Sequence, residues 1–220
     1  MRIALIILLF GIYCPLSAQF NVAVGYGLGY TPAVETNALV ADFNTVFDAT
    51  YNGKPMQELH FLHGINLGAR WKFDNVAFEL NWENLNRTRE ALGETEADQL
   101  FRKTIFYTVN NYSASLESAL GSLGFGIGGG FRNFKIKEEI ASTGETTPFL
   151  EDTQFFIKPY FSINLLGGDK ISLSIKPYLS IPFNNISLDA LSEELELGPS
   201  DRNERLWMGG VTFVFYTGNQ

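Results

Sequence analysis

Apolar and polar residues alternate along two neighbouring stretches of the chain, residues 154–165 and 171–181. Each stretch contains nearly the same phrase, Ile157–Ile163 in the first copy and Ile175–Ile181 in the second. A Gly-Gly turn signal separates them. This pattern predicts a β-hairpin whose strands each carry one apolar and one polar face.

Two different surroundings explain such a hairpin. In a soluble sheet the apolar face packs on a core, whereas in an outer-membrane barrel it faces lipid and the polar face lines the interior. Strands of about 9–11 residues fit a membrane-spanning barrel better than the usual strands of about 5–6 residues in soluble proteins. The hairpin therefore favours the barrel, and the patterns of the other segments are needed to distinguish it from a soluble sheet.

Alternation of the same kind recurs along most of the chain. Tight turns are expected between the second and third, fourth and fifth, and sixth and seventh strands, and long loops elsewhere. Short turns at one end and long loops at the other are typical of outer-membrane barrels. The sequence thus predicts an all-β, eight-stranded antiparallel up-and-down transmembrane barrel with short periplasmic turns and long extracellular loops. The six strands expected besides the hairpin are 20–30, 59–73, 76–83, 104–120, 123–132 and 206–216.

The segments between these strands are expected to be loops, with one helix. Residues 84–102, 134–152 and 183–205 are rich in polar or acidic residues. In the first connection, apolar residues from Leu39 to Phe47 recur at helical spacing and predict a short helix. It either caps the barrel mouth or docks a partner. The fourth strand changes phase between Val109 and Tyr112, which predicts either a β-bulge or a strand that leaves the membrane there.

Turn lengths set the expected register of two hairpins. A two-residue turn at Asp74-Asn75 places Arg70 directly opposite Glu79 on the lumen face. In the repeat hairpin, a three-residue turn from Gly167 to Asp169 places Lys158 opposite Tyr178, and Tyr160 opposite Lys176. It also opposes Pro159 and Pro177 on the lipid face, where each removes a ladder donor. This pair is a tolerated bend or a lateral weak point.

Charged residues fall on the face expected to point inward. An eight-stranded barrel is just wide enough to be filled by its own side chains, and an unpaired charge there costs several kcal/mol. We therefore expect a plugged lumen with Arg70 and Glu79 in contact and Glu117 near a lysine. The predicted network comprises Arg70, Glu79, Glu83, Glu117, Arg132, Lys158, Lys176, Tyr160 and Tyr178.

Composition and the N-terminal segment narrow the class of protein. Residues 1–18 read as a secretory signal peptide, with the barrel domain following over 19–220. The only cysteine, Cys14, lies in that segment, so the mature chain is expected to have no disulfide or cysteine metal site. The net charge of −8 gives no indication of nucleic-acid binding.

Candidate catalytic and cofactor signals are weak. His60 and His63 are three residues apart, so they fall on opposite faces of a strand and are not expected to hold one metal together. The glycine run from Gly124 to Gly130 resembles a dinucleotide fingerprint, but it has no following helix or acidic partner. We expect no enzyme activity, no cofactor and no metal.

The whole mature chain resembles the small eight-stranded outer-membrane barrels of the OmpA/OmpX type, in the form common in Bacteroidetes. The most specific piece is the last strand, where Gly210, Phe213 and Phe215 are similar to the signal read by the barrel-assembly machinery. The chain departs from the common pattern in that residues 217–220 follow the final aromatic strand. The resemblance implies fold and outer-membrane location rather than an activity.

Three functions remain open from the sequence. The first is a structural or accessory barrel whose acidic loops meet a protein partner or divalent cations at the lipopolysaccharide surface. The second is binding or passage of a small hydrophobic ligand beneath the helix at Leu39–Phe47, for which an apolar pocket at the mouth is expected. The third is a subunit of an outer-membrane secretion or assembly complex. The expected partners are outer-membrane lipid and lipopolysaccharide, together with the barrel-assembly machinery during insertion.

Overall fold

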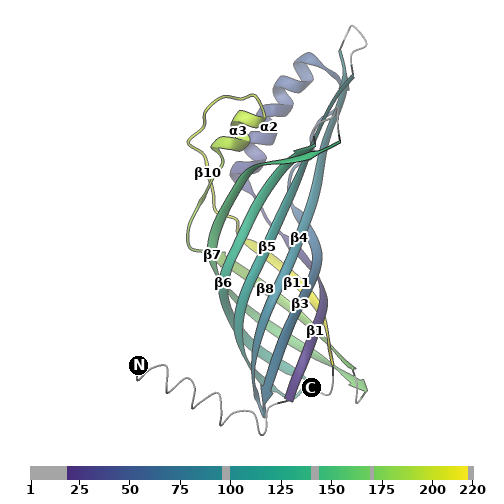
Figure 1. Ribbon diagram of the computed structural model, residues 1–220, viewed down its shortest axis with the longest axis vertical. Helices are drawn as coiled ribbons and strands as arrows, with labels where there is room; N and C mark the ends of the chain where they lie inside the picture. The colour runs from purple at the N-terminus through teal and green to yellow at the C-terminus, as the bar shows by residue number, and fades with distance from the viewer. Residues whose placement is uncertain (1–18, 96–99, 140–143, 169–170, 218–220) are drawn as a thin grey trace.

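A closed antiparallel sheet forms the body of the protein (Figure 1). The computed structural model describes residues 19–95, 100–139, 144–168 and 171–217, so the expected signal peptide lies outside the described residues. Two helices, α2 (Val34–Thr50) and α3 (Asp189–Glu194), lie at one end of the sheet. The strands of the wall are β1 (Gln19–Tyr30), β3 (Phe61–Phe73), β4 (Val76–Glu94), β5 (Leu100–Leu120), β6 (Leu123–Glu139), β7 (Thr146–Gly168), β8 (Ile171–Pro182) and β11 (Met208–Thr217).

Eight strands complete the ring. The nine-stranded sheet also includes the short strand β2 (Asn52–Lys54), which pairs only with β4. Strand β1 pairs with β3 on one side and β11 on the other, and the β4–β5 pairing completes the circle. Two further short strands, β9 (Ile186–Ser187) and β10 (Asn203–Glu204), pair with each other outside the wall. The eight-stranded antiparallel barrel predicted from the sequence is confirmed.

The lower part of the wall carries apolar side chains outside and polar or small ones inside. On β1, Val22 and Val24 are 45% and 51% exposed, whereas Ala23 between them is 0% exposed. Because an exposed continuous belt of large apolar side chains is stable only against hydrocarbon, this part of the wall matches the lipid-facing band of a transmembrane barrel.

Four neighbouring strands, β4 to β7, rise well beyond the others and form a tall wall on one side (Figure 1). The prediction that 84–102 and 134–152 are loops is therefore wrong over most of their length, because β4 continues to Glu94 and β7 begins at Thr146. The outward positions of these residues are polar, so their sequence pattern resembles that of a loop.

The bulge expected in the fourth strand is also wrong. Strand β5 pairs with β4 and β6 without a register shift from Thr104 to Ser118. Ile105, Tyr107 and Val109 are buried, on the same inward parity as Glu117. The apparent phase change arises because the interior itself changes from polar to apolar along the strand. The register shift in this wall lies between β6 and β7, at Ile136/Lys137.

The tight turns explain the register of the hairpins. Asp74 and Gly121 adopt positive φ angles of 47° and 64° in the turns before β4 and β6, as a tight turn requires. Between β7 and β8, residues 169–170 lie outside the described part of the chain. The register there differs by two residues from the prediction, since Tyr160 faces Tyr178. The two strands already pair at Gly168 and Ile171, and the register shifts by one residue before Leu165 faces Leu173.

Candidate functional site

The lumen of the lower barrel is organised around Lys176, which points inward from β8. Its Nζ lies 2.8 Å from Glu79 Oε2 and 3.2 Å from Glu117 Oε2. Arg70 Nη2 lies 2.8 Å from the other oxygen of Glu117. All four side chains are less than a tenth exposed, so two cations and two carboxylates share one desolvated cluster. Charge-assisted hydrogen bonds of this kind hold their partners in fixed geometry.

The register places Arg70 opposite Glu79, as the sequence predicts. The ion pair of Arg70, however, is with Glu117 rather than Glu79. The Glu79 carboxylate, which the register places opposite Arg70, pairs instead with Lys176. Lys176 is 97 residues from Glu79 in sequence and reaches it across the lumen. Cross-strand pairing thus determined which residues face each other, but contacts across the barrel determined the ion pairs.

A second polar centre surrounds Glu83, higher in the lumen. Asn111 Nδ2 donates to Glu83 Oε2 at 2.9 Å, and Lys158 Nζ lies 3.4 Å from the same oxygen. Lys158 Nζ also sits 4.0 Å from the centre of the Tyr178 ring, and Lys176 Nζ sits 5.0 Å from that of Tyr160. The lysines therefore contact the tyrosines expected from the sequence, although the direct register facing is Tyr160 to Tyr178.

Arg132 departs from the expected charge pairing. Its side chain is 0% exposed, yet no carboxylate among the described residues lies within ion-pair distance of it. It donates instead to the Leu206 backbone oxygen at 2.6 Å and to the Ser180 hydroxyl, and its guanidinium lies 4.7 Å from the centre of the Phe156 ring. A carbonyl, a hydroxyl and an aromatic face replace the expected acid.

Sequence reasoning missed two hydroxyl groups of the lumen cluster. Tyr216 Oη donates to Glu79 Oε2 at 2.7 Å, and Ser162 Oγ donates to Glu117 Oε1 at 3.0 Å. Their inward parity was visible, but their partners lie far away in sequence. A lumen cavity of about 30 Å³, lined by residues including Glu79, Lys176 and Tyr160, remains between these side chains. It has room for about one or two water molecules.

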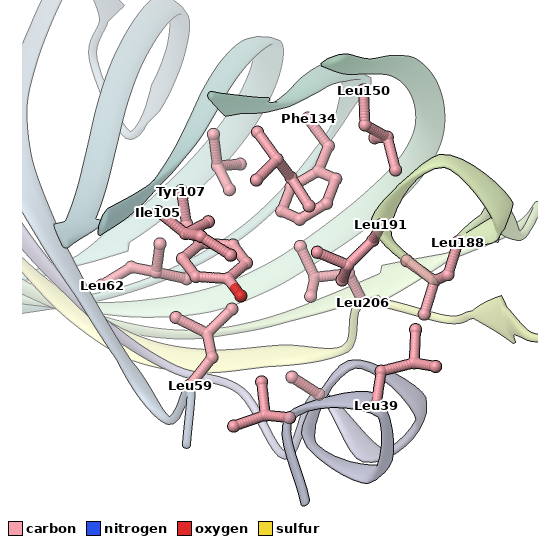
Figure 2. Packing of buried hydrophobic residues seen from close by; sticks show 14 of the residues in the cluster. Leu39, Leu59, Leu62, Ile105, Tyr107, Phe134, Leu150, Leu188, Leu191 and Leu206 are labelled. Carbon is pink, nitrogen blue, oxygen red and sulfur yellow. The ribbon is translucent and has the colours of Figure 1, made fainter. Parts of the chain in front are cut away.

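Above the charged cluster, the interior becomes an apolar core beneath the two helices (Figure 2). The predicted helix at Leu39–Phe47 is confirmed within α2, and Leu39, Val40, Phe43 and Phe47 are buried. Val46 is 58% exposed, so it does not belong to the buried face. Figure 2 shows Leu39 of α2, Leu191 of α3, and Ile105, Tyr107 and Phe134 of the tall wall pointing into one cluster. The helices are packed as a cap rather than left free.

Two asparagines hold the chain after α2 against the helix. Asn37 Oδ1 accepts from the Leu59 backbone N–H at 2.7 Å, and its Nδ2 donates to the Leu59 oxygen at 3.1 Å. Asn44 binds the backbone of Met56 in the same way. The Met56 N–H donates to Asn44 Oδ1 at 2.9 Å, and Asn44 Nδ2 donates to the Met56 oxygen at 2.8 Å. Each amide thus imitates a strand neighbour and satisfies buried backbone groups.

The segment before β11 caps the start of α2. The backbone N–H groups of Glu35 and Thr36 both donate to Glu204 Oε2 at 3.0 Å, which places a carboxylate at the helix N-terminus. Arg202 Nη2 lies 2.9 Å from Asp42 Oδ2 on the same helix. These contacts join segments more than 150 residues apart, and no local sequence signal predicts them.

A three-residue ionic latch, formed by Lys103, Glu138 and Glu194, ties α3 to the tall wall. Lys103 Nζ lies 2.9 Å from Glu138 Oε1 and 3.1 Å from Glu194 Oε1. Burial works against its charge, but the hydrogen bonds with the two carboxylates raise the pKa of Lys103. Burial and the hydrogen bond with Glu138 raise the pKa of Glu194. For Glu138 burial acts in the same upward direction, yet hydrogen bonds with Glu194 and Lys103 lower its pKa.

Among the described residues, two arginines of the same region have no carboxylate partner. Arg87 and Arg89 project from β4 into the cap, and the Nε atom of each is buried without a hydrogen-bond partner in the described part of the chain. The Tyr107 hydroxyl beside them is likewise buried and unpaired. Sequence reasoning placed both arginines in a loop and therefore missed them.

Of the remaining predicted residues, the phenylalanines and prolines face outward and the glycine faces inward. Phe213 and Phe215 face outward on β11, and Gly210 faces inward, where a Cβ would meet the Leu28 oxygen at 2.2 Å. Pro159 faces Ile127 of β6, and Pro177 faces Val211 of β11. Between β7 and β8, Tyr160 faces Tyr178 rather than Lys176, so the two prolines are displaced by two residues and the expectation that they oppose each other is wrong.

The two histidines take separate partners. His63 Nδ1 lies 2.6 Å from Tyr26 Oη, and His60 Nε2 lies 2.8 Å from Glu58 Oε2. Across the described residues there is no group of three or more His, Cys, Asp or Glu side chains suited to a metal ion.

Neither helix is long and apolar enough to cross a membrane, as judged over the described residues.

Comparison with known proteins identifies the fold alone. No protein family matches the sequence, and no curated protein resembles it. Among solved structures, Ail, the attachment invasion locus protein of Yersinia pestis, is similar with a TM-score of 0.50 and 9% identity, over 92% of this chain and 99% of that one. Ail in complex with the heparin analogue sucrose octasulfate gives 0.49 and 9%, with the same shares covered. Neisserial surface protein A gives 0.48 and 7%, over 92% of this chain and 99% of that one. With its closed ring of strands, the chain has the fold of a small eight-stranded outer-membrane barrel.

Proposed function

We propose that this protein is a plugged barrel of the outer membrane that acts at the cell surface as a structural or partner-binding protein, without transport or catalysis. The observation that carries the proposal is the filling of the interior in two layers. The lower layer is the charged cluster around Lys176, and the upper layer is the apolar core beneath α2 and α3. Between the lumen side chains, the cavity of about 30 Å³ is far too small for a solute to pass.

Conductance measurements test the plug. Purified protein in planar bilayers should show no large, steady conductance, because the desolvated cluster of ion pairs occupies the lumen. A stable open channel in the intact protein would contradict the proposal. The double variant Lys176→Ala with Arg70→Ala serves as the positive control if it folds, since removing both long cations widens the lumen.

The alternative of a hydrophobic ligand beneath the cap is less well supported. The mouth is apolar, as that function needs, but Leu39, Phe47 and Leu191 already fill it and are at most 2% exposed. A ligand would have to displace one of the helices. Tight binding of a fatty acid that protects α2 from proteolysis would favour this second function.

Partner binding is tested on the tall wall, which presents polar side chains to the outside above the apolar belt. A photo-crosslinking residue at Thr88, which is exposed on this face, should capture a protein partner in intact cells. The same probe at Leu116 in the belt should capture lipid or assembly proteins only. If no specific protein is crosslinked at Thr88, the partner-binding role is contradicted and only the structural role remains.

The finer assignments stay predictions. These are membership of the OmpA/OmpX-like barrels of Bacteroidetes, export by the segment 1–18, and recognition of Gly210, Phe213 and Phe215 by the assembly machinery. Substituting Phe213 and Phe215 together by alanine should leave the chain unassembled in the periplasm, which cell fractionation measures.

A further inference from the structure

Two open hollows lie in line on the lipid-facing side of β4, β5 and β6, and together they are called the groove. Its upper part is a hollow of about 600 Å³, and a second hollow of about 390 Å³ lies on the same strands nearer the tight turns. The upper hollow exists because Ala114 and Gly129, which face each other in register, put almost no side chain outside. The walls of the two hollows come from Leu67, Leu80, Trp82, Tyr112, Phe131, Val76, Leu116, Phe125 and Ile127.

The groove lies along the direction of the strands. Residues 76 to 82 of β4 span both hollows, and seven strand residues extend about 20 Å. The apolar band of an outer-membrane barrel is about 25 Å tall. One extended acyl chain therefore fits the length of the two hollows taken together.

Two rows of side chains mark the upper end of the groove. Trp82, Tyr112 and Phe131 face one another in register across the three strands, and the Tyr112 and Phe131 rings stack at 5.0 Å. Aromatic residues of this kind sit at the boundary between lipid tails and headgroups. Two positions further along each strand, the next outward residues are Asn84, Asn110 and Asn133, again in register.

The asparagine row offers amide donors and acceptors at headgroup level. Asn84 Nδ2 donates to Asn110 Oδ1 at 2.8 Å, and Asn133 Nδ2 donates to Glu151 Oε1 at 2.9 Å. Asn133 Oδ1 is buried and has no donor among the described residues, so it is not itself accessible to a ligand. The nearest cation above this row, Lys135, is held by Glu151 at 2.8 Å. The row is therefore better suited to hydroxyl groups, which both donate and accept, than to a phosphate that needs an unpaired cation.

We propose that this face holds one glycolipid of the outer leaflet, with an acyl chain in the groove and its saccharide headgroup on the asparagine row. The inference rests on the proposed placement in the outer membrane. It assigns a specific occupant to one stripe of the belt, whereas the rest of the belt contacts lipid without preference.

The test is native mass spectrometry of the full chain extracted from outer membranes in mild detergent. The wild-type barrel should retain one lipopolysaccharide molecule. In Gly129→Leu the retained fraction should fall about tenfold, the effect of displacing about two methylene groups from the groove. A Cβ at Gly129 meets only the Phe156 oxygen, at 3.6 Å, so the substitution fills the groove without disturbing the wall.

Gly209→Leu is the matched control. Gly209 faces outward on β11, on the opposite side of the ring from β5, with nothing within 4 Å of its Cβ position. This variant should retain lipopolysaccharide as the wild type does. Ala114→Leu fills the same groove from β5 and replaces Gly129→Leu if that variant fails to fold, as judged by heat-dependent mobility on gels.

Headgroup choice is measured by adding lipids back to delipidated protein. Asn110→Ala should weaken binding of lipopolysaccharide and leave binding of phosphatidylethanolamine unchanged. Equal retention by Gly129→Leu and Gly209→Leu, or equal affinity of the wild type for the two lipids, would overturn the glycolipid site. A folded barrel recovered from the outer membrane would still support the proposed function in that case, whereas its absence from that membrane would refute the proposed function itself.

Discussion

The lower barrel and the tall wall are built from the same strands but are inverted with respect to each other. On β5, the outward residues Tyr112 and Leu116 are apolar and the inward Glu117 is charged. Higher on the same strand, the outward Thr108 is polar while Tyr107 and Ile105 inside are apolar and buried. The strand keeps its two-residue alternation throughout, and only the distribution of polarity between the two faces changes.

This difference shows that the medium, rather than the strand, decides which face is apolar. Where lipid surrounds the barrel, the outer face is apolar and the narrow interior can be charged. Where water surrounds the wall, the apolar face turns toward the helices α2 and α3. The change occurs between Trp82 and Asn84 on β4 and between Phe131 and Asn133 on β6, so one level around the wall marks the upper boundary of the membrane.

The largest expected effect comes from removing the cation at the centre of the lower interior. Lys176→Met leaves Glu79 and Glu117 buried with one cationic partner fewer, and should lower the free energy of unfolding by about 3–5 kcal/mol. Urea titration of the barrel in lipid vesicles, followed by tryptophan fluorescence, measures the change. Lys137→Met on the outer face of the tall wall is the control and should shift stability by no more than about 0.5 kcal/mol. Equal losses of unfolding free energy in the two variants would mean that the charged interior of the lower barrel contributes no more to stability than the outer face of the tall wall.

A paired substitution on one strand tests the inversion directly. Leu116→Lys puts a charge against lipid and should cost about 2–4 kcal/mol, since this position is in the apolar band. Thr108→Lys on the same outward face of β5, above the boundary, should cost nearly nothing. The measurement is again unfolding in vesicles. A large loss for Thr108→Lys would mean that the membrane reaches higher on the wall than we infer.

The smallest expected effect concerns the latch between α3 and the tall wall. The pKa of Glu194 is raised on docking, so the protonated form is favoured, and its contribution is present at low pH and lost as pH rises through the raised value. Glutamine is permanently neutral. Glu194→Gln should therefore tighten α3 docking near neutral pH, by less than about 1 kcal/mol because the site is partly exposed.

Hydrogen exchange of the α3 backbone amides measures this difference. It should vanish below the ordinary carboxyl pKa of 4.5, where Glu194 is itself protonated. Glu193→Gln on the exposed side of the same helix serves as the control and should leave the exchange unchanged. Slower exchange in wild type than in Glu194→Gln at neutral pH would contradict the assigned direction.

Much of the lower barrel could be predicted from the sequence because strand alternation and turn residues are local signals. The Asp74-Asn75 turn gave the correct facing of Arg70 and Glu79, and the inward glycines and charges followed from parity. The helix within α2 was visible for the same reason, since its apolar spacing lies within one segment.

The tall wall and the ion pairs were missed for a different physical reason. Residues 84–94 and 134–139 carry polar side chains on their outer face. They form strands because their inward apolar side chains pack against the cap, which exists only in the folded protein. The partners of Lys176 and Arg132 come from across the barrel, and no pattern within one strand identifies them. The Gly-Gly signal between β7 and β8 indicates a turn but not its register, which pairs Gly168 with Ile171 and shifts by one residue before Leu165.

The contact of Glu204 with the start of α2 has a consequence for barrel closure. Helix α2 follows β1 directly, and Glu204 comes just before β11, so this contact bridges the chain on either side of the seam where the first and last strands meet. Together with Arg202 and Asp42 it works as a clasp across that seam. Parting β1 from β11 at the mouth would therefore require breaking these contacts as well as the hydrogen bonds between the two strands.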